Sequence, residues 1–302
     1  LSQKYLDVIT LSFNNLIYDM GRGTAQRNLD MKEFRLLKIS YPDSIPEQQR
    51  IVAKLDVAFA GIDTMIKKDK NNLEQTKILL QSIIDSNLDS LNYPCEKIEL
   101  KKFVTIKHGF AFRGQDFSRS TSANLPIVLT PGNFSENADL YFTNKNTKRM
   151  HSKVNKKLFF SKGDLVIVMT DLSAKMDLLG KPAFIRNENL LHNQRIGLVK
   201  NDELKILNDY LYFYFISKPY LAKIKKTASG TMVRHTAPNR ILDNKINLPI
   251  LLTHQKEIVK KITFARIQAE KYKQFKNKKI KLLENLRSNI LSKEIQNKSK
   301  SV

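Results

Sequence analysis

The strongest pair of candidate catalytic groups is Asp164 and Asp171, which flank a short run that reads as a β-strand. Two carboxylates beside a strand can hold a metal ion, as in a metal-dependent nuclease. The alternative is a turn, because Asp164 directly follows Lys162-Gly163 and an Asp in a turn caps its own backbone. We favour the turn, and we expect no catalysis from this pair.

Other residue types give no better site. Cys95 is the one cysteine, which excludes a disulfide scaffold and a cysteine-based zinc site. The 5 histidines show no metal-binding spacing. The chain contains no Asn-Pro-Pro-Tyr or Asp-Pro-Pro-Tyr methyltransferase motif and no glycine-rich phosphate or cofactor loop. We therefore predict no catalytic residue, no metal site and no cofactor for this chain.

The charge of the chain points to a polyanionic partner. Lys plus Arg number 52 and Asp plus Glu 29, a net charge of +23. The alternative is a proteome that is simply rich in lysine. Six lysines crowd one stretch near the end, where they would form a solvated face or meet an acidic partner subunit: Lys271, Lys273, Lys276, Lys278, Lys279 and Lys281. No stretch of 18 apolar residues and no signal peptide is visible, so we predict a cytoplasmic protein.

The same segment occurs twice, because residues 5–85 match the chain 207 positions further on without a gap. The matched pairs include Tyr5 and Tyr212, Gly23-Thr24 and Gly230-Thr231, Arg27 and Arg234, Pro42 and Pro249, Gln48 and Gln255, and Ile51-Val52 and Ile258-Val259. A domain-sized period indicates a duplicated module and not a solenoid.

Each copy ends in a long predicted helix. Apolar residues recur at three-and-four spacing from Ile51 to Ile83 and from Ile258 to Ile290. Each helix has about 40 residues, hence a length of roughly 60 Å. A single apolar stripe of that length needs a partner stripe, and the other copy is the simplest one. Taken alone, the helices would also suit a generic coiled-coil spacer.

The middle of the chain reads as a mixed α+β domain. Short β-rich runs alternate there with Gly, Asn, Ser and Pro clusters, and a helical stretch follows at Leu204–Thr227. The runs are Lys102–Lys107, Pro126–Thr130, Lys157–Phe160, Asp164–Thr170, Pro182–Arg186 and Arg195–Lys200. The predicted fold class is thus α+β, a mixed domain plus a long antiparallel two-helix coiled coil.

Five segments carry a resemblance to a known family. They are Lys107–Phe112, Lys162–Ile167, Leu191–Ile196, the Gly-Thr turns at Gly23-Thr24-Ala25-Gln26-Arg27 and Gly230-Thr231, and the helix entries at Pro46–Val52 and Leu248-Pro249. In this order and partly duplicated, they resemble the DNA-specificity subunit of Type I restriction–modification systems, whose plan is recognition domain, helix, recognition domain, helix. Two departures stand out: His254-Gln255 replaces the usual Glu-Gln, and most of the first recognition domain is absent.

The resemblance implies the domains and partners of the chain. Residues 1–46 would be the C-terminal remnant of a first recognition domain, 47–93 the first long helix, 94–253 a complete recognition domain, and 254–302 the second helix with a basic tail. The implied partners are double-stranded DNA, methyltransferase subunits docked on the helices, and a nuclease/translocase subunit. S-adenosylmethionine would be needed only by the methyltransferase. The incomplete first domain also suggests a self-dimer.

Reading DNA requires side-chain donors on loops that face the major groove, where Arg or Lys pairs with guanine and Asn or Gln with adenine. The candidate base readers are Arg113, Gln115, Arg119, Asn133, Lys175, Asn193, Gln194 and Arg195. The candidate phosphate contacts are Lys225, Lys226, Ser229, Thr231, Arg234 and His235. We interpret His108, His192 and His235 as polar surface groups or DNA contacts and not as bases.

Two other functions stay open at this point. One is a basic coiled-coil scaffold or RNA-binding protein without restriction partners, which would show no sequence preference. The other is a piece of the recognition region of a nuclease–methylase fusion. A self-contained fusion is excluded, because the catalytic motifs are absent from this sequence.

Overall fold

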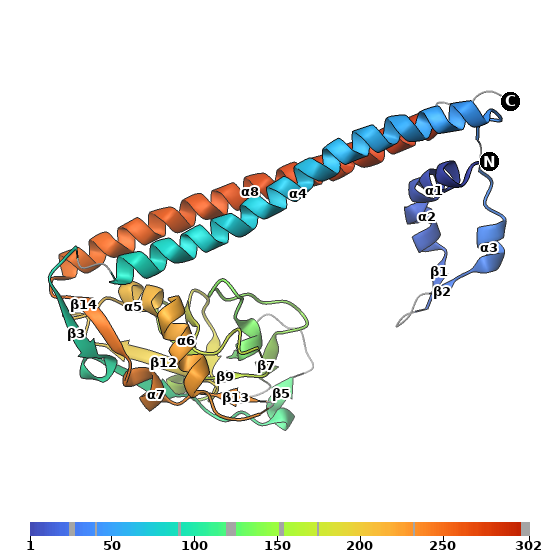
Figure 1. The fold of residues 1–302 in the computed structure, drawn as a ribbon. Helices are drawn as coiled ribbons and strands as arrows, with labels where there is room; N and C mark the ends of the chain where they lie inside the picture. The colour runs from blue at the N-terminus through green and yellow to red at the C-terminus, as the bar shows by residue number, and fades with distance from the viewer. Residues whose placement is uncertain are drawn as a thin grey trace. The chain divides into compact units, whose positions relative to one another are not determined.

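The computed structural model describes residues 1–23, 28–39, 41–89, 92–118, 125–150, 154–173, 175–231 and 233–296 (Figure 1). The chain divides into two compact units. The helical unit comprises Leu1–Lys77 and Gln268–Val302, and the globular unit comprises Ile78–Ile267. No helix in the described ranges is long and apolar enough to cross a membrane.

Two helices of 45 residues each, α4 (Ile45–Asp89) and α8 (Leu252–Gln296), run through both units. Their first residues differ by the repeat offset, and so do their last. Predicted as 47–93 and from 254 onward, the helices begin two residues earlier, with Pro46 in the first turn of α4, where its missing N–H has no partner to lose.

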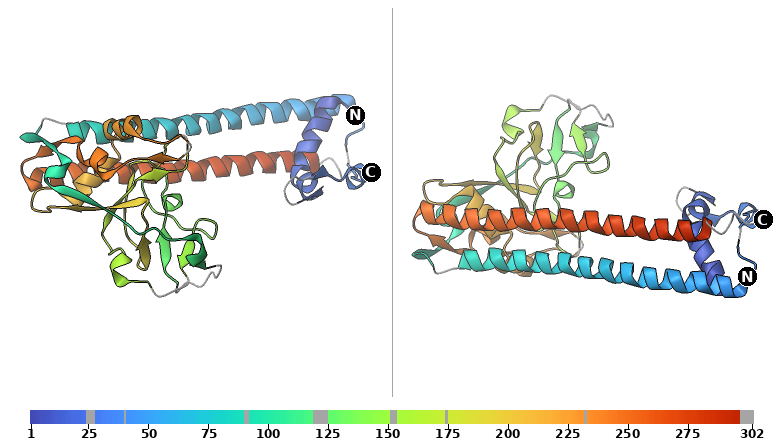
Figure 2. Two further views of the ribbon diagram at one scale, coloured as in Figure 1. Left: turned by 90° about the horizontal axis from the view of Figure 1, so that it is seen from below. Right: turned by 90° about the horizontal axis from the view of Figure 1, so that it is seen from above.

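Within the helical unit, α4 and α8 pack side by side and antiparallel (Figure 2). Lys54 pairs with Glu294 at 2.5 Å, Asp63 with Arg287 at 3.6 Å, and Asp69 with Lys276 at 2.5 Å, so rising numbers in α4 meet falling numbers in α8. This confirms the predicted antiparallel helix pair.

The N-terminal elements of the helical unit are α1 (Gln3–Ser12), α2 (Asn14–Asp19), β1 (Gly21–Arg22), β2 (Asn28–Leu29) and α3 (Met31–Arg35). From α1, Tyr5 and Ile9 share an apolar cluster with Ile51 and Leu55 of α4 and Leu291 of α8. The apolar face of α1 therefore packs against both long helices.

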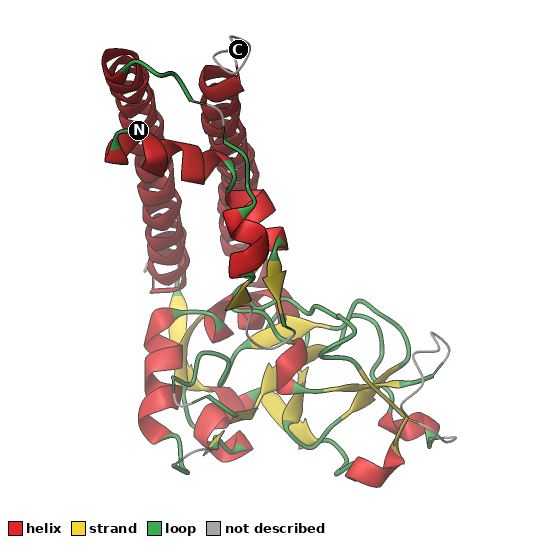
Figure 3. Ribbon diagram, turned by 90° about the vertical axis from the view of Figure 1, so that its right-hand side faces the viewer, coloured by secondary structure: helices red, strands yellow, loops and turns green. Residues whose placement is uncertain are grey.

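The globular unit holds two four-stranded sheets (Figure 3). The first has the order β10-β8-β12-β4 and is antiparallel throughout, with strands Pro182–Phe184, Leu165–Val168, Ile196–Asn201 and Val104–His108. The second has the order β11-β6-β7-β5, in which β11 and β6 are parallel, with strands Leu190–His192, Ile127–Leu129, Lys148–Met150 and Phe117–Ser118.

Two further strand pairs bring distant segments together. Strand β14 (Lys245–Pro249) pairs with β3 (Cys95–Glu99), so the two ends of the domain lie side by side. Strand β13 (Arg234–His235) pairs with β9 (Thr170–Asp171). In the described part of this unit, four short 3-10 helices lie in the connections: η1 (Leu100–Lys102), η2 (Gly114–Asp116), η3 (Pro131–Asn133) and η4 (Lys156–Leu158).

Strand β8 shows how the sequence builds the core. All four of its residues are buried. Successive side chains of a strand point to opposite faces, so both faces of β8 are covered by other residues. Leu165 and Ile167 join the cluster that contains residues of helix α5 (Asn208–Phe215), whereas Val166 and Val168 join a second cluster with Leu129 and Phe134. The predicted β-run at Asp164–Thr170 is therefore a strand between two apolar layers.

Two local predictions were wrong. The helical stretch Leu204–Thr227 is two helices, α5 (Asn208–Phe215) and α6 (Lys218–Thr227). They separate before Pro219, which lacks the N–H that a continuous helix needs. The run Lys157–Phe160 begins as the 3-10 helix η4 and not as a strand, since the Asn155 side chain caps the N–H of Lys157.

The ends of both repeats have the same local structure. Helices α3 (Met31–Arg35) and α7 (Pro238–Leu242) have bounds that differ by the repeat offset. The pairing of Arg22 with Asn28 corresponds to the bridge between Ser229 and His235. At the start of each long helix a fully buried glutamine donates to a proline carbonyl, Gln48 to Pro42 at 2.7 Å and Gln255 to Pro249 at 3.1 Å.

Candidate DNA interface

The two carboxylates that could have held a metal both bind backbone N–H groups, Asp164 in a turn and Asp171 at the end of β9. Asp164 accepts a hydrogen bond from the Ser161 N–H at 2.8 Å and forms an ion pair with Lys200 at 2.7 Å. Asp171 is buried and accepts from the N–H groups of Ser173 at 2.8 Å and Leu178 at 2.7 Å. The turn predicted for Asp164 is confirmed, and both carboxylates hold loops in shape.

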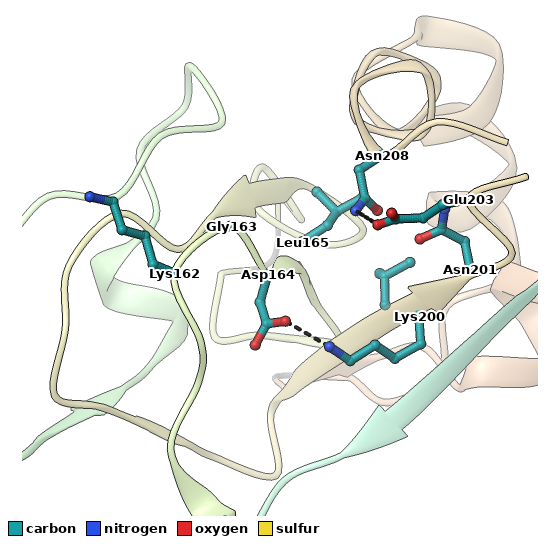
Figure 4. Close-up of a pocket in the computed structure, with 9 residues that line it drawn as sticks. Lys162, Gly163, Asp164, Leu165, Lys200, Asn201, Glu203 and Asn208 are labelled. Carbon is teal, nitrogen blue, oxygen red and sulfur yellow. Dashed lines mark hydrogen bonds and ion pairs between the residues drawn. The ribbon is translucent and has the colours of Figure 1, made fainter. Parts of the chain in front are cut away.

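A polar hollow beside Asp164 is lined by Lys162, Lys200, Asn201, Glu203 and Asn208 (Figure 4). Its two carboxylates are already engaged, since Asp164 binds Lys200 and Glu203 accepts from the Asn208 amide at 3.2 Å. Asn201 donates to the Ile206 carbonyl at 2.6 Å. We assign no chemistry to this hollow, and among the described residues no three His, Cys, Asp or Glu side chains gather as a metal site.

A chain of backbone hydrogen bonds joins three loops of the globular unit. The Phe110 N–H donates to the His192 carbonyl at 2.8 Å, and the Gln194 N–H donates back to the Phe110 carbonyl at 3.0 Å. The turn at 193–195 then connects to the residue between β8 and β9, because the Met169 N–H donates to the Arg195 carbonyl at 2.9 Å. The loop at 109–113 and the turn at 193–195 are thus fixed to one another.

The chain of bonds continues to the repeated Gly-Thr turn. The Thr236 N–H donates to the Met169 carbonyl at 2.9 Å, and the Ser229 and His235 backbones exchange two hydrogen bonds. The His235 ring lies 3.0 Å from the Thr170 hydroxyl. Segments 109–113, 193–195, 169–171, 229–231 and 233–236 are therefore joined by hydrogen bonds, and we call them the loop network.

Two glycines make the loop network possible. A side chain at Gly109 would place its Cβ 2.4 Å from the His192 carbonyl oxygen, closer than any real contact. Gly230 has a φ of +93°, and a Cβ there would lie 2.0 Å from the Val233 carbonyl oxygen. Both positions lie in segments that carried the family resemblance, and the close approach explains the need for glycine.

Most predicted contact residues that the structure describes present exposed side chains: Arg113, Gln115, Lys175, Gln194, Arg195, Lys226, Ser229, Thr231 and His235. Lys225 and Arg234 are half-buried. The loop network brings together Gln194 and Arg195 with Ser229, Thr231, Arg234 and His235. Arg113 and Gln115 follow Phe110 along the chain, in and beside η2.

Some of these side chains already have partners within the protein. Lys225 donates to the Lys175 carbonyl at 3.1 Å and lies 3.7 Å from Asp177, so it ties two loops together. Arg234 donates to the Gly230 carbonyl at 2.6 Å and thereby closes the Gly-Thr turn. The charged groups of Lys225 and Arg234 lie near the surface, and contacts within the protein fix their positions.

Two predicted contact residues have side chains that are turned inward. Asn133 is 0% exposed, and its amide accepts from Thr130 and donates to the Asn146 carbonyl, so it organises a turn. Asn193 is 8% exposed and caps the Arg195 N–H at 2.9 Å. We remove Asn133 from the contact set and give Asn193 a positioning role. Arg119 lies outside the described residues.

His192 also differs from its prediction as a surface group. It is 8% exposed, its ring lies 4.6 Å from that of Phe160, and its Nε2 lies 2.8 Å from the Ile196 carbonyl oxygen. Burial lowers the pKa of His192 below its ordinary value of 6.5, although the bond to Ile196 opposes this effect. The ring is a packed interior group.

Two residues of the surface were not predicted. Phe110 is 52% exposed although its backbone is fixed at both N–H and carbonyl. Arg240 of α7 donates to the Thr227 carbonyl at 2.6 Å and to the Ser229 hydroxyl at 3.2 Å. An aromatic residue placed directly after a glycine in a polar loop was the available signal for Phe110.

The fold defines a class of protein: a mixed α+β domain with basic residues on exposed loops, joined to a long helix pair. Residues 4–75 and 94–284 match the family model described as the Type I restriction modification DNA specificity domain, and the chain belongs to that family. It is a DNA-recognition subunit and is not itself an enzyme.

Solved structures share this fold. A chain from a structure of the assembly and conformational transition of a type I R-M system aligns with a TM-score of 0.74 and 16% identity, over 97% of this chain and 70% of that one. The HsdS subunit from Thermoanaerobacter tengcongensis aligns with a TM-score of 0.55 and 15% identity, over 99% and 71%. No curated protein sequence matches.

Proposed function

We propose that residues 94–253 form a complete target-recognition domain that reads one half of a DNA site through the loop network. The observation that carries this proposal is the unbroken series of backbone bonds from Phe110 through Arg195 and Met169 to His235. Specific readout requires donors on a rigid support. A mobile donor loses conformational entropy when it binds, and this loss offsets the free energy of the hydrogen bond.

The proposed contacts fall into two groups. Arg113, Gln115, Gln194 and Arg195 are exposed donors of the kinds that recognise guanine and adenine edges. A second set is proposed to hold phosphates: Lys175, Lys225, Lys226, Ser229, Thr231, Arg234 and His235. Phe110, whose backbone carbonyl accepts from the Gln194 N–H, has an exposed ring that would stack on a base or sugar.

Residues 1–46 are proposed to be the end of a first recognition domain. Supporting this are the matched bounds of α3 and α7 and the matched pairings Arg22–Asn28 and Ser229–His235. In this arrangement the first copy supplies the last quarter of a domain, and a second half-site would be read by another recognition domain.

The helices are proposed to dock methyltransferase subunits on the faces that point away from their shared seam. Large apolar side chains are exposed at equivalent positions of the two copies: Val57 and Phe264, Met65 and Tyr272, Leu79 and Leu286. On a helix of 3.6 residues per turn, each trio falls within an arc of about 80°. Exposed apolar stripes mark binding surfaces, and two equivalent stripes suit two copies of one partner.

This role places the chain in a larger cytoplasmic assembly. The methyltransferase would bring S-adenosylmethionine and the chemistry, and a nuclease/translocase subunit would complete restriction. Family membership supports these partners. The sequence-independent alternative, a basic scaffold or RNA-binding protein, makes the opposite prediction for DNA selectivity.

DNA binding tests the first part of the proposal. Binding selection on random duplexes should return a preferred half-site, and Arg195→Ala should weaken that site about 10–100-fold with less effect on random DNA. Lys226→Ala should weaken all duplexes alike and reduce the salt slope by about 1. Lys162→Ala, an equal charge change in the polar hollow, is the control. Equal affinity for every duplex would exclude the reading role.

Docking is tested with a purified Type I methyltransferase subunit from the same organism as this chain. Tyr272→Glu and Phe264→Asp should each lower its affinity, because a buried carboxylate without a partner is costly. Ser288→Asp, on an exposed position of α8 outside the stripe, is the matched control. If all three variants bind the subunit as the parent does, the outer stripe is not the docking face.

A further inference from the structure

A buried ion cluster lies in the seam between α4 and α8 of the helical unit. Asp69 of α4, with a side chain 2% exposed, lies 2.5 Å from Lys276 and 3.0 Å from Lys279 of α8. The Lys276 side chain is 12% exposed. Hydrogen bonds from Lys276 and then Lys279 lower the pKa of Asp69, so it is charged at neutral pH.

The cluster has a special place in the repeat. Lys276 is the residue of the second copy that corresponds to Asp69 of the first, because the two are 207 positions apart. In an antiparallel pair of equivalent helices, a residue meets its own equivalent only at the local two-fold axis. The other seam pairs, Lys54 with Glu294 and Asp63 with Arg287, join non-equivalent positions.

A residue on that axis decides which helices can pair. If α4 paired with α4 of a second chain in the same geometry, Asp69 would face Asp69. If α8 paired with α8, Lys276 would face Lys276 and Lys279. Like charges in a buried seam are strongly disfavoured, because they lose hydration without gaining a partner.

We propose that the Asp69–Lys276–Lys279 cluster makes α4 accept α8 and reject a second α4, and makes α8 reject a second α8. The chain thereby excludes exchanged dimers in which like helices pair. This inference concerns partner choice in the seam and is independent of DNA reading and of docking on the outer faces.

The flanking pairs do not oppose a pair of α8 helices. In an α8–α8 pair, Lys261 and Glu270, the equivalents of Lys54 and Asp63, would face Glu294 and Arg287. Both contacts would be attractive. The like-charged lysines on the axis are therefore the feature that opposes pairing of two α8 helices.

Charge reversal in the full chain tests the proposal. Asp69→Lys and Lys276→Asp should each lower Tm by several degrees, and the double variant, which restores an opposite pair, should recover most of the loss. Asp63→Lys reverses an exposed seam charge and should change Tm little. Circular dichroism checks that all variants keep their helices.

Mixing supplies the second measurement. In a refolded mixture of the two single variants, each reversed helix finds an opposite charge only in the other chain. Two-chain complexes should therefore form, as seen by sedimentation with two distinguishable tags, in clear excess over the parent refolded alone. A double variant no more stable than the singles would overturn the proposal, as would a mixture with no more two-chain complex than the parent.

Discussion

The side chain of Gln255 joins three backbone segments at the start of α8. Its Oε1 accepts from the Leu207 N–H at 3.0 Å, and its amide donates to the carbonyls of Lys205 at 2.8 Å and Pro249 at 3.1 Å. The side chain is 0% exposed. Gln255→Ala would leave one donor and two acceptors without partners in the interior of the globular unit.

The cost follows from those three groups. A buried polar group left unpaired costs about 1–3 kcal/mol, and the low end applies where a water molecule can enter the space. We therefore expect Gln255→Ala to lower the free energy of unfolding of the globular unit by about 3–4 kcal/mol. At about 2–4 °C per kcal/mol for a unit of this size, Tm should fall by about 10 °C.

Gln48, the equivalent of Gln255 in the helical unit, provides an internal comparison because it makes two backbone hydrogen bonds where Gln255 makes three. Its side chain accepts from the Ser2 N–H at 2.8 Å and donates to the Pro42 carbonyl at 2.7 Å. Gln48→Ala should cost about 2–3 kcal/mol in that unit.

Urea unfolding can be followed by circular dichroism and tyrosine fluorescence, because the chain has 10 Tyr and 0 Trp. Gln194→Ala, at an exposed position, should stay within about 0.5 kcal/mol of the parent. A Gln255→Ala variant as stable as that control would refute the reasoning.

Three further substitutions have definite expected outcomes. Ile62→Asp, at a position 4% exposed in the helix seam, should cost several kcal/mol in thermal unfolding, and an unchanged Tm would mean that the helices are not a mutual core. Gly109→Ala should push segment 109–110 away from His192 and Asn193, and both stability and half-site affinity should fall; unchanged binding would separate the loop network from DNA reading. Because burial depresses the pKa of His192, the unfolded chain takes up its proton first, so stability should fall as the pH drops below 6.5; His192→Gln should remove that part of the pH dependence, and an identical pH profile would contradict it.

The large-scale architecture could be predicted because it depends on patterns that extend over many residues. The 207-residue offset and the apolar periodicity from Ile51 to Ile83 predicted two long antiparallel helices, and the structure confirms them. Such patterns average over many side chains, so single exceptions such as the buried Asp69 do not obscure them.

The details of the candidate site could not be predicted, because they depend on which way one side chain turns. Asn133 and Gln194 are both amides in loops, yet one organises a turn from the interior and the other is exposed. The partner that fixes Asn133 is the carbonyl of Asn146, in a separate part of the chain. The residues next to Asn133 in the sequence do not predict such a contact.

The cluster on the local two-fold axis bears on the history of the chain. An ancestral half-length protein that paired with itself would have had the same residue on both sides of that axis, so an opposite-charge pair could not exist there. Asp69 facing Lys276 could arise only after the two halves had separate codons and were free to diverge, as they are in this chain. After the substitution that gave these two positions opposite charges, pairing of either half with a copy of itself would have placed like charges on the axis. The change would therefore have made the dependence of each half on the other hard to reverse.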